Sequence, residues 1–130
     1  MSTDYGSIIG YGASLKQDTQ AWIEFLQPLI PDIDEALVSD LLNGYAQDHP
    51  ALLAAYPGLV FTSAGDQIIG QTFPVVLAKS GYMNTAHLSS AKGPIAQPEP
   101  SQEEIDQLQA VVSAGLTEKD LDWQSYKYIG

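Results

Sequence analysis

The chain has 130 residues, of which 45% are hydrophobic and 16% are charged, so it is not disordered throughout and its length suits one domain. It has no cysteine, which excludes disulfides, thiolate metal sites and cysteine nucleophiles. It has 16 acidic residues against five lysines, and the net charge of −11 argues against binding nucleic acid or an anionic membrane. We found neither a membrane-spanning apolar run nor a secretory signal pattern, and therefore expect a cytoplasmic protein.

Residues 7–15 are predicted to form the first strand, because apolar side chains recur there with the period of two that one sheet face requires. Gly10 and Gly12 inside this strand indicate a bulge or a place where another segment packs against the backbone. A helix is expected from about Gln20 to the region of Pro28, with Asp18 or Thr19 as its cap. Its apolar stripe has helical spacing and comprises Trp22, Phe25, Leu26, Leu29 and Ile30.

The middle of the chain predicts two further helices and a hairpin. The second helix is expected to start at Pro31 and its apolar stripe ends at Tyr45, while residues 51–56 form a short third helix. Residues 59–63 predict a strand, residues 64–66 its turn and residues 67–73 the returning strand. Pro74 is expected to end that strand or to mark a sheet edge, with more strand at 75–78 and a loop at 80–84.

Residues 91–100 form a proline-rich connector that separates a main body at 1–90 from a C-terminal part at 101–130. Ser101 and Glu104 have the spacing of a capping box, which predicts a helix to about Ala114. The aromatic tail at 123–129 is expected to be an added strand or a loop packed on the body. We therefore expect a single α+β domain over residues 1–130, with a small antiparallel sheet of three to four strands and amphipathic helices packed on one face.

The acidic residues are concentrated towards the two ends of the sequence. Residues 1–48 carry a net charge of −7, residues 49–97 a net charge of +1, and residues 98–130 a net charge of −5. Solvated helix faces explain such a distribution, and the alternative is that the acids converge into one patch that meets a basic partner. The residues of this candidate partner-binding patch are Asp32, Asp34, Glu35, Asp40, Glu103, Glu104 and Asp106.

No catalytic, cofactor or metal motif is complete. The glycine-rich first strand has Leu15 where a dinucleotide fingerprint needs its third glycine, and the Asp32 and Asp34 pair lacks the ligand and glycine that complete a calcium loop. We therefore predict a non-enzymatic acidic protein-interaction module without a cofactor, such as an inhibitor, an immunity-like protein or an accessory protein of a bacterium or phage. Its partner is another protein, which is basic if the acidic patch forms the contact.

Two other interpretations stay open. The first is a small-molecule binder or an enzyme with a site around Tyr82 and His87, for which Tyr11 and Lys79 are further candidates. The second is a homo-oligomeric structural subunit, joined through an unpaired edge strand or through the aromatic tail.

Overall fold

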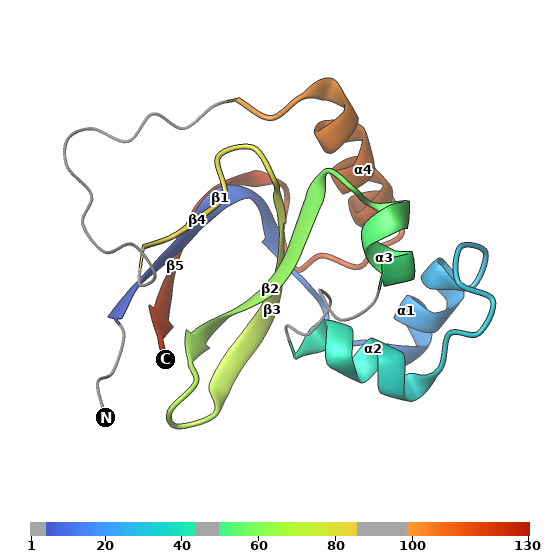
Figure 1. Cartoon of the computed structure of the whole chain (residues 1–130), viewed down its shortest axis with the longest axis horizontal. Coiled ribbons are helices and arrows are strands. Elements are labelled where there is room, and N and C mark those ends of the chain that lie inside the picture. Colours follow the sequence, from blue (N-terminus) through green and yellow to red (C-terminus); the bar gives the residue numbers. More distant parts are fainter. Residues whose placement is uncertain (1–4, 44–49, 86–98) are drawn as a thin grey trace.

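The computed structural model describes residues 5–43, 50–85 and 99–130 (Figure 1). The elements are β1 Tyr5–Ser14, α1 Thr19–Leu26, α2 Glu35–Leu42, α3 Pro50–Ala55, β2 Leu59–Asp66, β3 Gln71–Ala78, β4 Met83–Asn84, α4 Gln102–Ser113 and β5 Asp122–Ile129. The α+β class is confirmed, but the sheet has five strands rather than three to four. The aromatic tail forms all of β5 except Asp122, and Met83 and Asn84, expected in a loop, pair with β1.

The strand pairings form a closed circuit. β1 is antiparallel to β5 along most of its length and to β3 near its end. β3 pairs along its whole length with β2, which in turn runs parallel to β5 at Gly65 and Asp66. The sheet therefore curls on itself and has an inner face, filled by a small cluster around Ile8, Val75 and Leu77.

Gly12 lies where β1 leaves β5 and meets β3. A side chain at this position would collide with the Val76 carbonyl oxygen, and its Cβ would lie 2.9 Å from the Leu77 Cα. The expected close backbone approach within the glycine-rich strand is therefore confirmed, and it is what lets the curled sheet close.

The main core lies between the outer face of the sheet and the four helices, all of which contribute to it. In Figure 1 the helices lie together on one side of the strands. The largest buried side chains of this core include Trp22, Leu41, Leu52 and Leu108, one from each helix. Because α4 contributes Leu108 and β5 pairs with β1, the C-terminal part shares the core of the main body.

The helix caps follow the local sequence signals. Asp18 caps α1 by accepting a hydrogen bond from the Ala21 N–H at 3.1 Å, and Ser101 and Glu104 form the complete capping box of α4. The second helix begins later than expected, at Glu35 rather than Pro31, because Asp34 has extended backbone and its carboxylate caps the Leu37 N–H at 2.8 Å. Gly44 and the predicted end of that helix's stripe, as well as most of the proline-rich connector, lie outside the described residues.

The predicted position of the hairpin turn is wrong. β2 continues through residues 64–66, and the turn lies over residues 67–70, where Asp66 accepts hydrogen bonds from the Ile68 and Ile69 N–H groups. Gly70 completes the turn with a φ of 71°. Pro74 does not end the strand, since β3 continues through it from Gln71 to Ala78. The Pro74 carbonyl faces β1 and accepts the Leu15 N–H at 2.9 Å.

Candidate functional site

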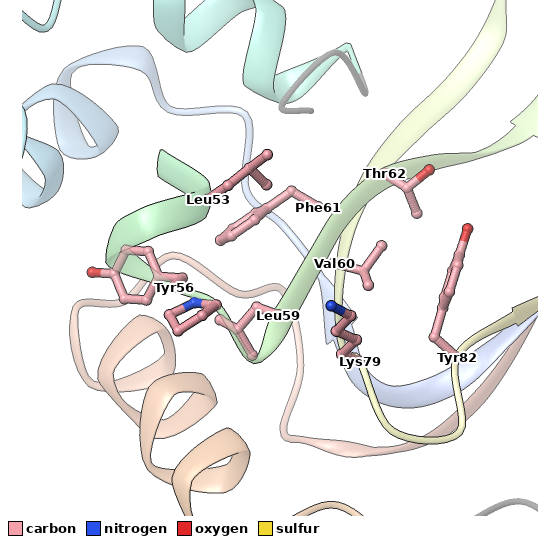
Figure 2. A pocket seen from close by; sticks show the side chains of 9 residues that line it. Leu53, Tyr56, Leu59, Val60, Phe61, Thr62, Lys79 and Tyr82 are labelled. Atoms are coloured by element: carbon pink, nitrogen blue, oxygen red, sulfur yellow. The ribbon is translucent and has the colours of Figure 1, made fainter. Parts of the chain in front are cut away.

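A cleft of about 560 Å³ lies between α3, the first half of β2 and the turn that follows β3 (Figure 2). Leu53 in α3 and Tyr56, directly after α3, lie on one side of β2, and Lys79 and Tyr82 approach from the turn on its other side. The full set of lining residues is Leu53, Tyr56, Pro57, Leu59, Val60, Phe61, Thr62, Lys79 and Tyr82. A volume of this size is typical of ligand-binding sites.

The cleft runs along an edge of β2. Successive side chains of a strand point to opposite faces, yet the four successive residues from Leu59 to Thr62 all line the cleft. Only an open edge of the strand exposes both faces to one cleft. In the part of the chain that the structure describes, β3 covers the other edge of β2, and β5 reaches this one only at Gly65 and Asp66.

Backbone geometry determines which hydrogen-bonding groups face this edge. The Pro74 carbonyl points to β1, so its register partner Ser63 directs its own N–H and C=O away from β3. Because hydrogen-bonded and non-hydrogen-bonded pairs alternate in an antiparallel ladder, Phe61 and Leu59 also direct their N–H and C=O groups away from β3. The Leu59 N–H is already satisfied by the Tyr56 carbonyl at 3.2 Å. The backbone groups that remain at this edge are those of Phe61, in the lining of the cleft, and of Ser63, a buried residue just beyond the lining.

Aromatic packing makes the floor of the cleft rigid. The rings of Tyr56 and Phe61 are 6.2 Å apart in an edge-to-face arrangement, and Phe25 stacks on Tyr56 with 6.0 Å between centroids. Phe61 and Tyr56 are both almost fully buried. Burial also raises the pKa of the Tyr56 hydroxyl, so Tyr56 stays neutral at physiological pH.

The turn after β3 supplies the polar side of the cleft. Lys79 is exposed, and it is the only charged side chain among the described residues that line the cleft. The Tyr82 N–H donates to the Lys79 carbonyl at 3.3 Å, and Gly81 adopts a φ of 79° to make this turn possible. Burial raises the pKa of Tyr82, and the nearby Tyr128 adds to this, although a hydrogen bond with Thr62 opposes both effects.

Glu104 fixes the turn to the N-terminus of α4. Its carboxylate accepts hydrogen bonds from the Ser80 N–H and Oγ, both at 2.7 Å, and from the Ser101 N–H at 2.9 Å. Burial alone would raise the pKa of this carboxyl, but the bonds from Ser80 and Ser101 outweigh it and lower the pKa to about 2. Glu104 therefore sets the position from which Lys79 extends.

A second cleft of about 340 Å³ lies beside the first and shares Pro57 and Lys79 with it. Its other lining residues are Gly58, Ser80, Ser101, Glu103 and Glu104. Lys79 therefore stands between a cleft along β2 whose other lining residues are uncharged and a smaller cleft that carries carboxylates.

The residues of the predicted acidic patch have different environments. Asp32, Asp34, Glu35 and Asp40 are exposed at or near α2, and Glu103 and Asp106 are exposed on α4. α2 packs on α1 and the sheet, whereas α4 packs on β2 and β3, and Figure 1 shows α3 between the two helices. Glu104 is only 6% exposed, so a solvated helix face does not explain this one of the acidic residues. Its capping-box bond to Ser101 and its bonds to Ser80 explain the burial.

Of the four residues named for a small-molecule site, the structure brings two together. Lys79 and Tyr82 line the cleft along β2, while Tyr11 contacts Trp123 at a ring distance of 5.8 Å and packs against the main core. His87 and His49 lie outside the described residues. The apolar walls of the cleft were missed, because Leu53, Tyr56 and Phe61 have the spacing of ordinary core residues and no sequence signal separates them from those.

Within residues 5–43, 50–85 and 99–130, no three histidine, aspartate or glutamate side chains come together in a way that could hold a metal ion. No described helix combines the length and the hydropathy needed to cross a membrane. Comparisons with protein-family models, with curated proteins and with solved structures found no match to this chain.

Proposed function

We propose that this protein is a non-enzymatic protein-interaction module that binds an extended segment of another protein along the free edge of β2. The observation that carries the proposal is the position of the cleft, which follows an edge to which no described strand is paired between Leu59 and Ala64. A segment added there would continue the backbone ladder through the N–H and C=O groups of Phe61 and Ser63.

The cleft walls support binding of side chains on both faces of such a segment. On one face, Leu53, Tyr56 and Phe61 offer an apolar and aromatic surface. On the other face, Thr62 and Tyr82 offer hydroxyl groups beside the aliphatic surface of Val60. Main-chain bonds then provide affinity, and the pockets for alternate side chains provide selectivity.

The ionisable groups of the cleft support a binding function over catalysis. A general acid or base works best with a pKa near the operating pH. Tyr56 and Tyr82 have pKa values raised above the ordinary value of 10.0. The remaining ionisable group of the lining is a single exposed lysine, which supports the proposal that no acid–base reaction takes place there.

In this proposal the acidic residues of α2 and α4 do not form the contact itself. A net charge of −11 would accelerate association with a basic partner over distances of about a Debye length, roughly 10 Å at 0.1 M salt, and the β2 edge would then hold the bound segment. The module would act in the cytoplasm, a reducing compartment with which a chain without cysteine is compatible.

The test compares two exposed leucines, one inside and one outside the cleft. Leu53 is 40% exposed on the cleft wall and Leu29 is 49% exposed elsewhere, so Leu53→Glu and Leu29→Glu add the same charge with similar effects on folding. The tagged protein is used to capture partners from native lysate at low and at high salt, with identification by mass spectrometry. We expect a partner that the wild type and Leu29→Glu retain at low salt and that Leu53→Glu loses. Equal capture by both variants would contradict a role of the cleft.

A further inference from the structure

We infer that the segment bound on β2 is a C-terminus: an apolar peptide end that runs antiparallel to β2, with its terminal carboxylate at Lys79. This inference rests on the proposed function and specifies the chemistry of the partner. Its support comes from the charge of the lining, from the two ends of the free edge and from the position of Lys79 along β2.

The charge of the lining selects an anionic group. Lys79 is the only charged side chain among the described residues of the cleft, whereas the whole chain has 16 acidic residues and five lysines. A site with apolar walls and a single cation complements a ligand with apolar side chains and a single carboxylate. The adjoining cleft holds two carboxylates: that of Glu104 is already occupied by Ser80 and Ser101, and that of Glu103 is exposed and accepts a hydrogen bond from the Gln107 side chain at 3.4 Å.

The free edge is short and is closed at both ends. At its far end β5 occupies the edge from Gly65 onward, through Tyr128 and Ile129. At its near end the Leu59 N–H is taken by the Tyr56 carbonyl, where the α3–β2 connection turns away. A bound strand therefore cannot extend beyond both ends of this edge, whereas the last few residues of a chain can pair with it and end there.

The position of Lys79 gives the direction of the bound segment. The Lys79 N–H donates to the Gly58 carbonyl at 2.8 Å, so Lys79 stands beside the start of β2. A segment antiparallel to β2 has its carboxyl end beside the start of β2. A parallel segment has its amino end there, and its ammonium group would be repelled by Lys79. Antiparallel pairing is also the more stable arrangement per residue. The Glu104 bonds to Ser80 hold the adjacent residue in place, so the lysine extends from a fixed turn.

The inference can be tested with peptides that differ only at the carboxyl end. A synthetic pool of hexapeptides, randomised except for a last residue of Val, Leu, Ile or Phe, is prepared once as free acids and once as amides. Peptides retained by the protein are identified by mass spectrometry, and the affinity of the best ones is measured by fluorescence anisotropy. Lys79→Gln is compared with Lys127→Gln, a matched removal of an exposed lysine outside the cleft.

We expect free acids to bind about fivefold more tightly than the corresponding amides, which is the effect of one exposed ion pair. Lys79→Gln should remove this difference, Lys127→Gln should preserve it, and high salt should reduce it. Equal binding of acids and amides would overturn the inference, as would displacement of the peptides by octanoate at equal concentration, which would indicate a site for small apolar carboxylates.

The failure of the inference and that of the proposed function give different results. If acids and amides bind equally and Leu53→Glu weakens both, the edge binds peptides but does not read a terminus. If the pool contains peptides that bind and Leu53→Glu weakens none of them, the cleft is not the binding site and both proposals fail. An absence of any retained peptide would likewise overturn the inference.

Discussion

The substitution Glu104→Gln tests whether one buried carboxylate holds α4 to the turn that carries Lys79. Both oxygens of Glu104 accept hydrogen bonds, one from the Ser80 N–H and the other from the Ser80 hydroxyl and the Ser101 N–H. A glutamine has the same shape but replaces one of the two acceptors with an NH₂ donor. At least one backbone N–H then loses its partner, at a cost of about 1–3 kcal/mol.

The pKa of Glu104 gives a second estimate of the same contribution. The pKa falls from an ordinary value of 4.5 to about 2, and each unit corresponds to about 1.4 kcal/mol, so the ceiling is about 3 kcal/mol. Glu104 lines the small cleft at the start of α4, and solvent there lowers the expected effect to about 2 kcal/mol. We therefore expect Glu104→Gln to lower the free energy of unfolding by about 2 kcal/mol at pH 7.

The pH dependence distinguishes an ionised acceptor from a packing effect. Because the folded-state pKa lies below the unfolded-state one, the contribution of Glu104 is fully present above pH 4.5 and is lost as the pH falls through about 2. Urea denaturation of the wild type and of Glu104→Gln should thus show a difference that narrows with acidification. Glu103→Gln, an exposed neighbour, serves as the control and should change stability by less than about 0.5 kcal/mol. An effect of Glu104→Gln at pH 7 that is as small as that of Glu103→Gln would refute this explanation. So would a loss of unfolding free energy that is the same at pH 7 as at about pH 2.

Three further predictions concern the closure of the sheet, the core and the cleft. Gly12→Ala should lower the free energy of unfolding by about 2–3 kcal/mol in urea titrations, because the added Cβ meets the backbone of β3. The control Gly70→Ala adds a Cβ that meets no atom, but at a φ of 71° it should lower the free energy of unfolding by about 1 kcal/mol. Equal losses for the two variants would contradict the close contact of Gly12 with β3. Trp22→Phe should lower the free energy of unfolding by about 2 kcal/mol, because Trp22 is fully buried and its indole N–H donates to the Lys16 carbonyl at 3.0 Å. Trp123→Phe, at a position that is 36% exposed, should have less than half that effect, and thermal unfolding of both variants measures the difference. Burial raises the pKa of Tyr82, so its contribution to stability is present below pH 10 and is lost as the pH rises above it; ultraviolet titration of the wild type against Tyr82→Phe should show one tyrosine fewer among the late-titrating groups.

The features that the sequence predicted correctly depend on neighbouring residues. A cap such as Asp18, or the pair of Ser101 and Glu104, acts over three residues. The first part of the predicted apolar stripe, from Trp22 to Leu26, repeats within α1, whereas Leu29 and Ile30 lie beyond its end and Leu29 is 49% exposed. The sequence pattern of residues 64–70 is ambiguous, and it predicted the hairpin turn at 64–66 instead of 67–70. Ile68 and Ile69 have the composition of a strand, and only the Asp66 side chain, together with Gly70, makes them a turn.

The cleft could not be predicted, because it depends on contacts between distant residues. Glu104 was recognised as a helix-capping residue, but its bonds to Ser80 span 24 positions and no local pattern indicates them. The free edge of β2 exists because β5 diverges from it before Gly65, which is a property of the closed sheet and not of the β2 sequence. Lys79 and Tyr82 were named as candidates from their residue types, and the curled sheet supplies the walls around them.

The pairing of β1 with β5 has a consequence for the time course of folding. Tyr5 is the register partner of Ile129, so this contact of the first strand spans almost the whole described chain. Folding slows as the sequence separation between contacting residues grows, and β2 and β3, joined by a turn of four residues at 67–70, can form a hairpin long before this contact. During synthesis, β1 lacks its main partner until residues 122–129 have been added. Until then its unpaired edge can capture another chain.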